Sequence, residues 1–96
     1  MIRIKLMADY QCFPLWGADE ENLGNISPHS LPISEKLKED LIEWGNQYDL
    51  TLNLDDPANS GFKDENAELH FRKFGEQLLQ RLQIELGRGY SIFLRL

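Results

Sequence analysis

The sequence predicts an α+β fold in which two main helices pack on a small two- or three-stranded sheet formed by the terminal strands. Apolar and polar residues alternate at both ends of the chain, and two internal segments repeat apolar residues every three or four positions. A length of 96 residues fits a single domain, residues 1–96, with one small core. With 42% hydrophobic and 27% charged residues, the composition is close to the globular average and does not favour a disordered chain.

The two ends of the chain are predicted to be strands. At the N-terminus, one face of the period-two pattern consists of Ile2, Ile4, Leu6 and Ala8. At the C-terminus, the corresponding face consists of Tyr90, Ile92, Leu94 and Leu96. Because each strand needs a cover for its apolar face, we expect both in one sheet, in either direction. The opposite faces carry the bases Arg3, Lys5 and Arg95. Either the acidic middle of the chain folds over these bases, or the sheet face stays open and the acids form a separate patch.

Residues 9–33 show no sustained periodicity and are expected to form a long loop. Its first half is apolar enough to pack down, because it contains Tyr10, Phe13, Leu15 and Trp16. The tip at residues 17–25, which includes the acidic run 19–21, is expected to face water.

A first helix is predicted to begin after Ser34, which is a suitable N-cap. Its apolar stripe consists of Leu37, Leu41, Trp44 and Tyr48. The end of this helix is ambiguous, because residues 50–54 alternate like a strand whereas Leu52 also continues the helical stripe. The absence of a turn signal favours continuation; the alternative adds a third strand to the sheet.

Residues 55–61 are dense in turn formers and are expected to form a loop. A second helix is predicted to begin near Asp64 or Asn66 and to end at Gly87, which is suited to the position after a helix. Its buried stripe consists of Ala67, Phe71, Phe74, Leu78 and Leu82.

Composition also excludes several classes of protein. The single cysteine, Cys12, rules out an internal disulfide and a cysteine-rich zinc module. The chain has no apolar run long enough to span a membrane, and its N-terminus lacks the apolar core of a signal peptide, so we expect a cytoplasmic protein. A net charge of −6 and a pI near 4.8 argue against binding to nucleic acid.

The sequence offers few candidates for catalysis, and we expect no catalytic residue, metal site or cofactor. Cys12 lacks a neighbouring base and reads as a structural residue, and neither His29 nor His70 has a second ligand one turn away. Asp55 and Asp56 could hold a hard cation or act as an acid–base pair, but their position before a proline in a turn favours a structural role.

The charge is distributed unevenly along the chain. Residues 9–65 contain thirteen acidic residues and three lysines, a net charge of −10, whereas the segments on either side are each +2. Such a field steers a basic partner and raises its association rate. The alternative is an acidic surface that only keeps a small protein soluble.

Two short motifs carry a resemblance to known proteins. The first is the run 5–10 followed by Cys12 and the segment 14–16; the second combines the segments 55–57 and 60–62. With these motifs the chain resembles small acidic bacterial immunity proteins of contact-dependent growth inhibition and polymorphic toxin systems. The resemblance implies a cytoplasmic protein that forms a heterodimer with a cognate toxin C-terminal domain of nuclease type. It carries over no catalytic residue.

For a basic toxin domain, the contacts are expected to come from acidic residues with a few aromatic anchors. The predicted partner-binding residues are Trp16, Asp19, Glu20, Glu21, Glu39, Asp40, Glu43, Asp49, Asp55, Asp56 and Phe62. Two other functions remain open: a small metal-dependent hydrolase that uses the loop at Asp55 and Asp56, and a self-associating regulatory or scaffold domain. Neither nucleic acid nor membrane is an expected partner.

Overall fold

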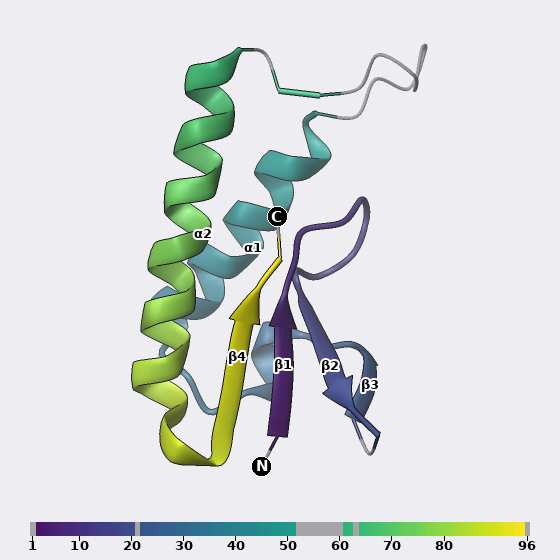
Figure 1. Cartoon of the computed structure of the whole chain (residues 1–96), viewed down its shortest axis with the longest axis vertical. Coiled ribbons are helices and arrows are strands. Elements are labelled where there is room, and N and C mark those ends of the chain that lie inside the picture. The colour runs from purple at the N-terminus through teal and green to yellow at the C-terminus, as the bar shows by residue number, and fades with distance from the viewer. Residues whose placement is uncertain (1, 21, 52–60, 63, 96) are drawn as a thin grey trace.

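The computed structural model describes residues 2–20, 22–51, 61–62 and 64–95. The chain forms, in order, β1 (Ile2–Leu6), β2 (Leu15–Asp19), β3 (Asn22–Asn25), a short 3-10 turn η1 (Pro28–Ser30), α1 (Glu35–Asp49), α2 (Glu65–Leu86), a second 3-10 turn η3 (Gly87–Gly89) and β4 (Tyr90–Leu94). Figure 1 shows the two helices behind and beside a single sheet. The predicted α+β class is confirmed.

The sheet has the strand order β3-β2-β1-β4. The terminal strands are neighbours, as expected, and they run parallel, with Ile2 opposite Tyr90 and Leu6 opposite Leu94. A parallel pair requires a long crossover, and here β2, β3 and both helices lie between the two strands in the chain (Figure 1). The other two strand pairs are antiparallel.

The expected two- or three-stranded sheet was too small, because Leu15–Asp19 and Asn22–Asn25 pair as two further strands, in a hairpin, where a loop was expected. These strands have only five and four residues, and Gly17 pairs with Gly24, so the hairpin shows no apolar alternation. β2 gains its place from tertiary pairing, in which Leu15 lies opposite Leu6 and is fully buried. A pattern search detects strands that bury a regular face, and this hairpin does not do so.

Helix α1 begins where the sequence predicts. The Ser34 hydroxyl accepts the N–H of Leu37 at 3.2 Å. The helix ends at Asp49. The favoured prediction, in which it continues towards Leu52, was therefore wrong for Leu50 and Thr51, which form a turn. Leu50 is 86% exposed, and the Thr51 hydroxyl donates to the Tyr48 carbonyl at 2.6 Å. Residues 52–60 lie outside the described part of the chain, which leaves the alternative of a strand there untested.

Helix α2 also has the predicted ends. The Asp64 carboxylate accepts the N–H of Ala67 at 2.8 Å and caps the helix at its first turn. At the other end, Gly87 adopts a φ of 75°, a left-handed conformation that costs glycine little.

The hydrophobic core fills the space between the two helices and one face of the sheet. Among the described residues it includes Ile4, Leu6, Leu15, Ile33, Leu37, Leu41, Trp44, Phe71, Leu78 and Leu82. Trp44 lies at the contact between the helices, where it stacks on Phe71 at a centroid distance of 4.6 Å. Its indole N–H donates to the Phe71 carbonyl at 2.9 Å. The tryptophan therefore joins α1 to α2 through both an aromatic contact and a hydrogen bond.

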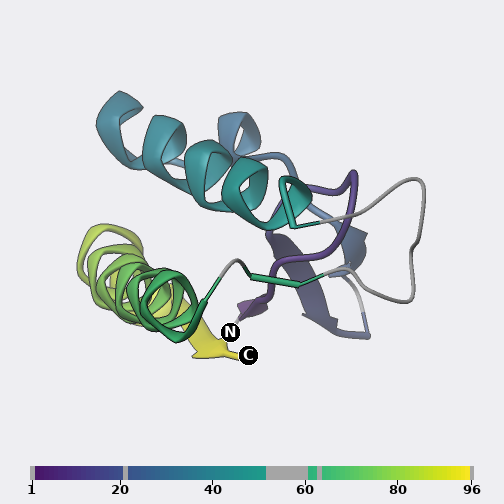
Figure 2. The same ribbon diagram turned by 90° about the horizontal axis from the view of Figure 1, so that it is seen from above.

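Both helices lie on the same face of the sheet, as Figure 2 shows from above. The opposite face carries Arg3 and Lys5, with Lys5 placed in register between Trp16 and Phe93. The Lys5 ammonium lies 6.0 Å from the Trp16 ring centroid, and Phe93 is 38% exposed. Of the two expectations for these bases, the described residues fit the open sheet face.

The outer edge of β4 is covered by a side chain from α2. The Gln83 amide donates to the Tyr90 carbonyl at 2.9 Å and to the Gly87 carbonyl at 3.3 Å, and its oxygen accepts the Ile92 N–H at 3.3 Å. This amide occupies backbone groups that another strand could otherwise pair with.

Candidate functional site

The predicted acidic residues on α1 lie on two sides of the helix. Glu39 and Glu43 are exposed and are separated by four residues, which places them on one outward stripe. Asp49 lies in the last turn and is half-buried, where its carboxylate accepts the Gln11 N–H at 2.8 Å. Glu39 and Glu43 are therefore the part of the predicted set that shares one stripe, and Asp49 lies farther along the same helix on a neighbouring stripe.

Asp40 instead points towards α2. Its carboxylate accepts from the Arg81 guanidinium at 2.7 Å and pairs with the Lys36 ammonium at 3.2 Å. Burial acts to raise the pKa of Asp40, but the hydrogen bonds and charges of Arg81 and Lys36 outweigh it and hold that pKa below its usual value. Asp40 therefore links the two helices, whatever contact it makes with a partner.

The remaining predicted contacts are dispersed. The Asp19 carboxylate accepts the Arg3 N–H at 3.0 Å at the end of the hairpin, and Glu20 is exposed in the turn that follows. Glu21, Asp55 and Asp56 lie outside the described residues.

The two predicted aromatic anchors lie in different places. Trp16 is half-buried on the open face of the sheet, and its indole N–H donates to the Met7 carbonyl at 2.9 Å. Phe62 is half-buried against the helices, with its ring centroid 5.0 Å from that of Phe71. The structure therefore does not assemble the predicted anchors into one site.

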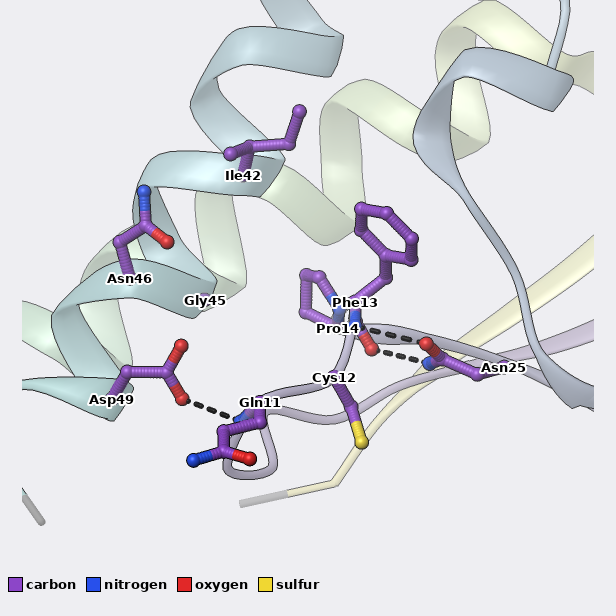
Figure 3. Close-up of a pocket in the computed structure, with 9 residues that line it drawn as sticks. All are labelled: Gln11, Cys12, Phe13, Pro14, Asn25, Ile42, Gly45, Asn46 and Asp49. Atoms are coloured by element: carbon purple, nitrogen blue, oxygen red, sulfur yellow. Dashed lines mark hydrogen bonds between the residues drawn. The ribbon is translucent and has the colours of Figure 1, made fainter.

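A groove of about 290 Å³ lies between the second half of α1 and the loop that joins β1 to β2. Figure 3 shows that side chains from the loop and from the helix face each other across it. The groove is lined by Gln11, Cys12, Phe13, Pro14, Asn25, Ile42, Gly45, Asn46 and Asp49. Of the predicted partner-binding residues it contains only Asp49.

The loop wall of this groove is fixed by hydrogen bonds on both sides. Asn25 accepts the Phe13 N–H at 2.9 Å and donates to the Phe13 carbonyl at 2.6 Å (Figure 3). Gln11 adopts a φ of 58°, which is uncommon for a residue other than glycine, and in this conformation its N–H reaches Asp49. Left-handed backbone outside glycine persists only where its surroundings impose it.

The loop packs on the helix at Gly45. A Cβ placed at this position would lie 3.4 Å from the Pro14 Cδ, so the ring of Pro14 packs directly on the helix backbone. With Pro14 buried beneath, the Phe13 side chain stays 41% exposed.

Sequence reasoning missed the lining residues Phe13, Asn25, Ile42 and Asn46. Phe13 was expected to pack down with its neighbours, which holds for Pro14 and Leu15 but not for this ring. Nothing in the sequence distinguished the Phe13 ring from its buried apolar neighbours. The role of Asn25 depends on a contact twelve residues away and left no signal.

The chemistry-bearing residues do not form a reactive cluster in the described part of the chain. Cys12 is a free, half-buried thiol at the groove, and both His29 and His70 are exposed on other elements. Among the described residues, no group of three or more His, Cys, Asp or Glu side chains is placed to hold a metal ion. Burial raises the pKa of the Tyr48 phenol, which lies in a stack with Tyr10 and keeps its proton at neutral pH.

None of the helices in the described part of the chain is long and apolar enough to cross a membrane.

Comparison with known proteins identifies a family. The model of a family described as Serratia CdiI immunity protein-like matches residues 2–95, nearly the whole chain. No curated protein matches the sequence closely enough to count as a relative. The match confirms the resemblance to immunity proteins of contact-dependent growth inhibition and supports a role in immunity. The chain belongs to the Serratia CdiI immunity protein-like family.

Proposed function

We propose that this chain is a cytoplasmic immunity protein that binds the toxic C-terminal domain of a cognate nuclease-type toxin and neutralises it through a protein–protein interface. The family supports the immunity role. The acidic surface supports a basic partner, and the 1:1 heterodimer is part of the proposal.

The outward acidic stripe of α1 is the observation that carries this proposal. Glu39 and Glu43 are exposed one turn apart, and like charges at this spacing destabilise a helix by about 0.2–0.5 kcal/mol. Asp49 adds a third carboxylate at the end of the same helix. Since these charges do not help the helix to form, their arrangement fits a role in attracting a partner of opposite charge.

A nuclease is the toxin class that suits this surface best. An enzyme that handles a phosphate backbone needs a basic cleft. An acidic helix face can occupy such a cleft or dock beside it, and its charge speeds the encounter. The other predicted contacts, the acids of the hairpin and of residues 55–56 with Trp16 and Phe62, stay part of the proposal, but Trp16 lies on the opposite face of the sheet and would need a second area of contact.

Co-expression tests the function directly. The C-terminal toxin domain encoded by the adjacent upstream gene is expressed in a host cell with and without this chain, growth is scored, and the purified mixture is run on a sizing column. We expect growth arrest that this chain relieves and a stable complex that co-elutes at 1:1 stoichiometry. Arrest without rescue, with no co-elution, would overturn the proposal.

The electrostatic part has its own test, with a matched control. The double variant Glu39→Gln/Glu43→Gln removes the acidic stripe, whereas Glu65→Gln/Glu76→Gln removes two exposed carboxylates from α2. We expect the first variant to lower the association rate roughly severalfold at low salt, and the second to change it little. The difference between wild type and the first variant should shrink as ionic strength rises. Association rates that do not depend on salt would contradict this role for the carboxylates.

A further inference from the structure

We infer that the groove between α1 and the β1–β2 loop receives one arginine or lysine side chain of the toxin, with the Phe13 ring as its platform. This inference rests on the proposed function and names the point on the surface where the toxin would be anchored. It depends on three features of the groove: an exposed aromatic residue on a held backbone, an available carboxylate and a small volume.

Phe13 is an exposed ring on a rigid backbone. Its side chain is 41% exposed, while both its N–H and its carbonyl are held by the Asn25 side chain at 2.9 and 2.6 Å. An aromatic residue fixed in this way loses little conformational entropy when a partner covers it. Buried aromatic anchors supply much of the binding energy in protein interfaces.

Among the residues that the structure describes, Asp49 is the only charged one that lines the groove. One of its carboxylate oxygens accepts the Gln11 N–H (Figure 3), and within the described part of the chain the other makes no hydrogen bond. That oxygen is available to accept from a cation, in a charge-assisted hydrogen bond that is about twice as strong as a neutral one.

The surroundings of the groove are negative. Glu39 and Glu43 lie on the helix stripe adjacent to the one that carries Ile42 and Asp49. Lys38 precedes Ile42 by one turn, but its ammonium is paired with a Glu35 carboxylate oxygen at 3.0 Å. A cation that enters the groove therefore meets an aromatic face and a net negative field, the two features that favour cation–π contact.

The volume limits what can enter. About 290 Å³ is just below the range for sites that bind whole small molecules, roughly 300–1,000 Å³. Ile42 and Pro14 provide apolar walls for the methylene stem of a long side chain, which prefers apolar contact while its charged end meets a polar group. Arginine fits best, because its guanidinium offers a planar face to an aromatic ring and several N–H donors to a carboxylate.

The test compares two phenylalanines of similar exposure on different surfaces. Phe13→Ala removes the platform, whereas Phe93→Ala removes a ring that is 38% exposed on the open sheet face. Binding of each variant to the purified C-terminal toxin domain from the adjacent upstream gene is measured by titration calorimetry. We expect Phe13→Ala to raise the Kd at least about tenfold, as is typical of an anchor residue, and Phe93→Ala to change it less than about twofold.

Two further variants make the result independent of Phe13. Asp49→Asn keeps an oxygen that accepts the Gln11 N–H but removes the charge, and we expect a severalfold weaker Kd. Asn46→Arg places a guanidinium of this chain at an exposed position that lines the groove, and we expect a loss at least as large as that of Phe13→Ala. Thermal melting of each variant confirms that it is folded.

The outcomes separate this inference from the proposed function. If wild type binds the toxin domain but Phe13→Ala and Asn46→Arg bind equally well, the groove is not the anchor point and the inference is wrong, while the immunity role stands. If Phe93→Ala alone weakens binding, the toxin docks on the open sheet face instead. If wild type does not bind at all, the proposed function and this inference both fail.

Discussion

Adding a single methyl group at Gly75 should destabilise the protein, although the same change at Gly45 should not. Both glycines are buried within helices, where replacing glycine by alanine gains about 1 kcal/mol from helix propensity. The two positions differ in what the new Cβ meets. At Gly75 it would lie 2.8 Å from Trp44 Cζ2, whereas at Gly45 its nearest neighbour is the Pro14 Cδ at 3.4 Å.

Trp44 cannot move aside easily. It is fully buried, it stacks on Phe71, and its indole N–H donates to the Phe71 carbonyl, which is also the acceptor that helix geometry assigns to the N–H of Gly75. Carbon atoms pack at about 3.5–4.0 Å, so the contact at Gly75 is too short by more than half an ångström. Overpacking of this kind costs about 1–3 kcal/mol. Because Trp44 cannot move, the cost should lie in the upper part of that range. After the gain in helix propensity is subtracted, we expect Gly75→Ala to lower the free energy of unfolding by about 1–2 kcal/mol.

Urea denaturation of wild type, Gly75→Ala and Gly45→Ala measures the difference in free energy of unfolding. A loss of 1 kcal/mol corresponds to a fall in Tm of about 4–8 °C in a domain of this size, so thermal melting gives an independent reading. Gly45→Ala should be as stable as wild type or gain up to about 1 kcal/mol. If Gly75→Ala proves at least as stable as wild type, the close contact between Trp44 and α2 does not limit the packing of the helices.

Two further predictions concern contacts of α2. Because the ordinary pKa of Asp40 is 3.8 and the folded pKa is lower, its pairing with Arg81 stabilises the protein fully above pH 3.8, and that contribution is lost as the pH falls through the folded value. Asp40→Asn should therefore lose about 1 kcal/mol of unfolding free energy at neutral pH and nothing in strong acid, measured by urea denaturation; an equal loss at both would refute the charge effect. Gln83→Ala should lower the free energy of unfolding by about 1 kcal/mol and expose the edge of β4. Size-exclusion chromatography at several concentrations should then detect more self-association than for Gln80→Ala, the matched exposed control. Unchanged stability and sizing would contradict a capping role for this amide.

The helices and their ends could be predicted from the sequence because their signals are local. Ser34 and Asp64 cap the N–H of a residue three positions along the chain, and Gly87 supplies the left-handed turn at the end of α2. The end of α1 was predicted less well. The Thr51 hydroxyl stops the helix by binding the Tyr48 carbonyl, and threonine gives no strong stop signal in a sequence.

The acidic residues could be predicted as a set but not sorted into roles. Asp40 and Glu39 are adjacent in sequence, yet one pairs with Arg81 across the helix interface and the other faces outward. The difference depends on the rotation of α1 against α2, which is set by the packing of Trp44 against Phe71. Sequence periodicity identified the apolar stripe of α1. It did not identify which polar residues beside that stripe form an ion pair with α2.

The sequence alone determined that this is an acidic α+β domain with a strand at each end, two amphipathic helices and a family resemblance to immunity proteins. Tertiary structure decided the hairpin at residues 15–25, the parallel pairing of the terminal strands and the groove, in which Asn25, Phe13 and Asp49 meet from three separate segments. The physical reason is the range of the forces involved. Caps and helical stripes act within a few residues, whereas strand pairing and the fixing of a loop depend on hydrogen bonds between segments that become neighbours only when the core has formed.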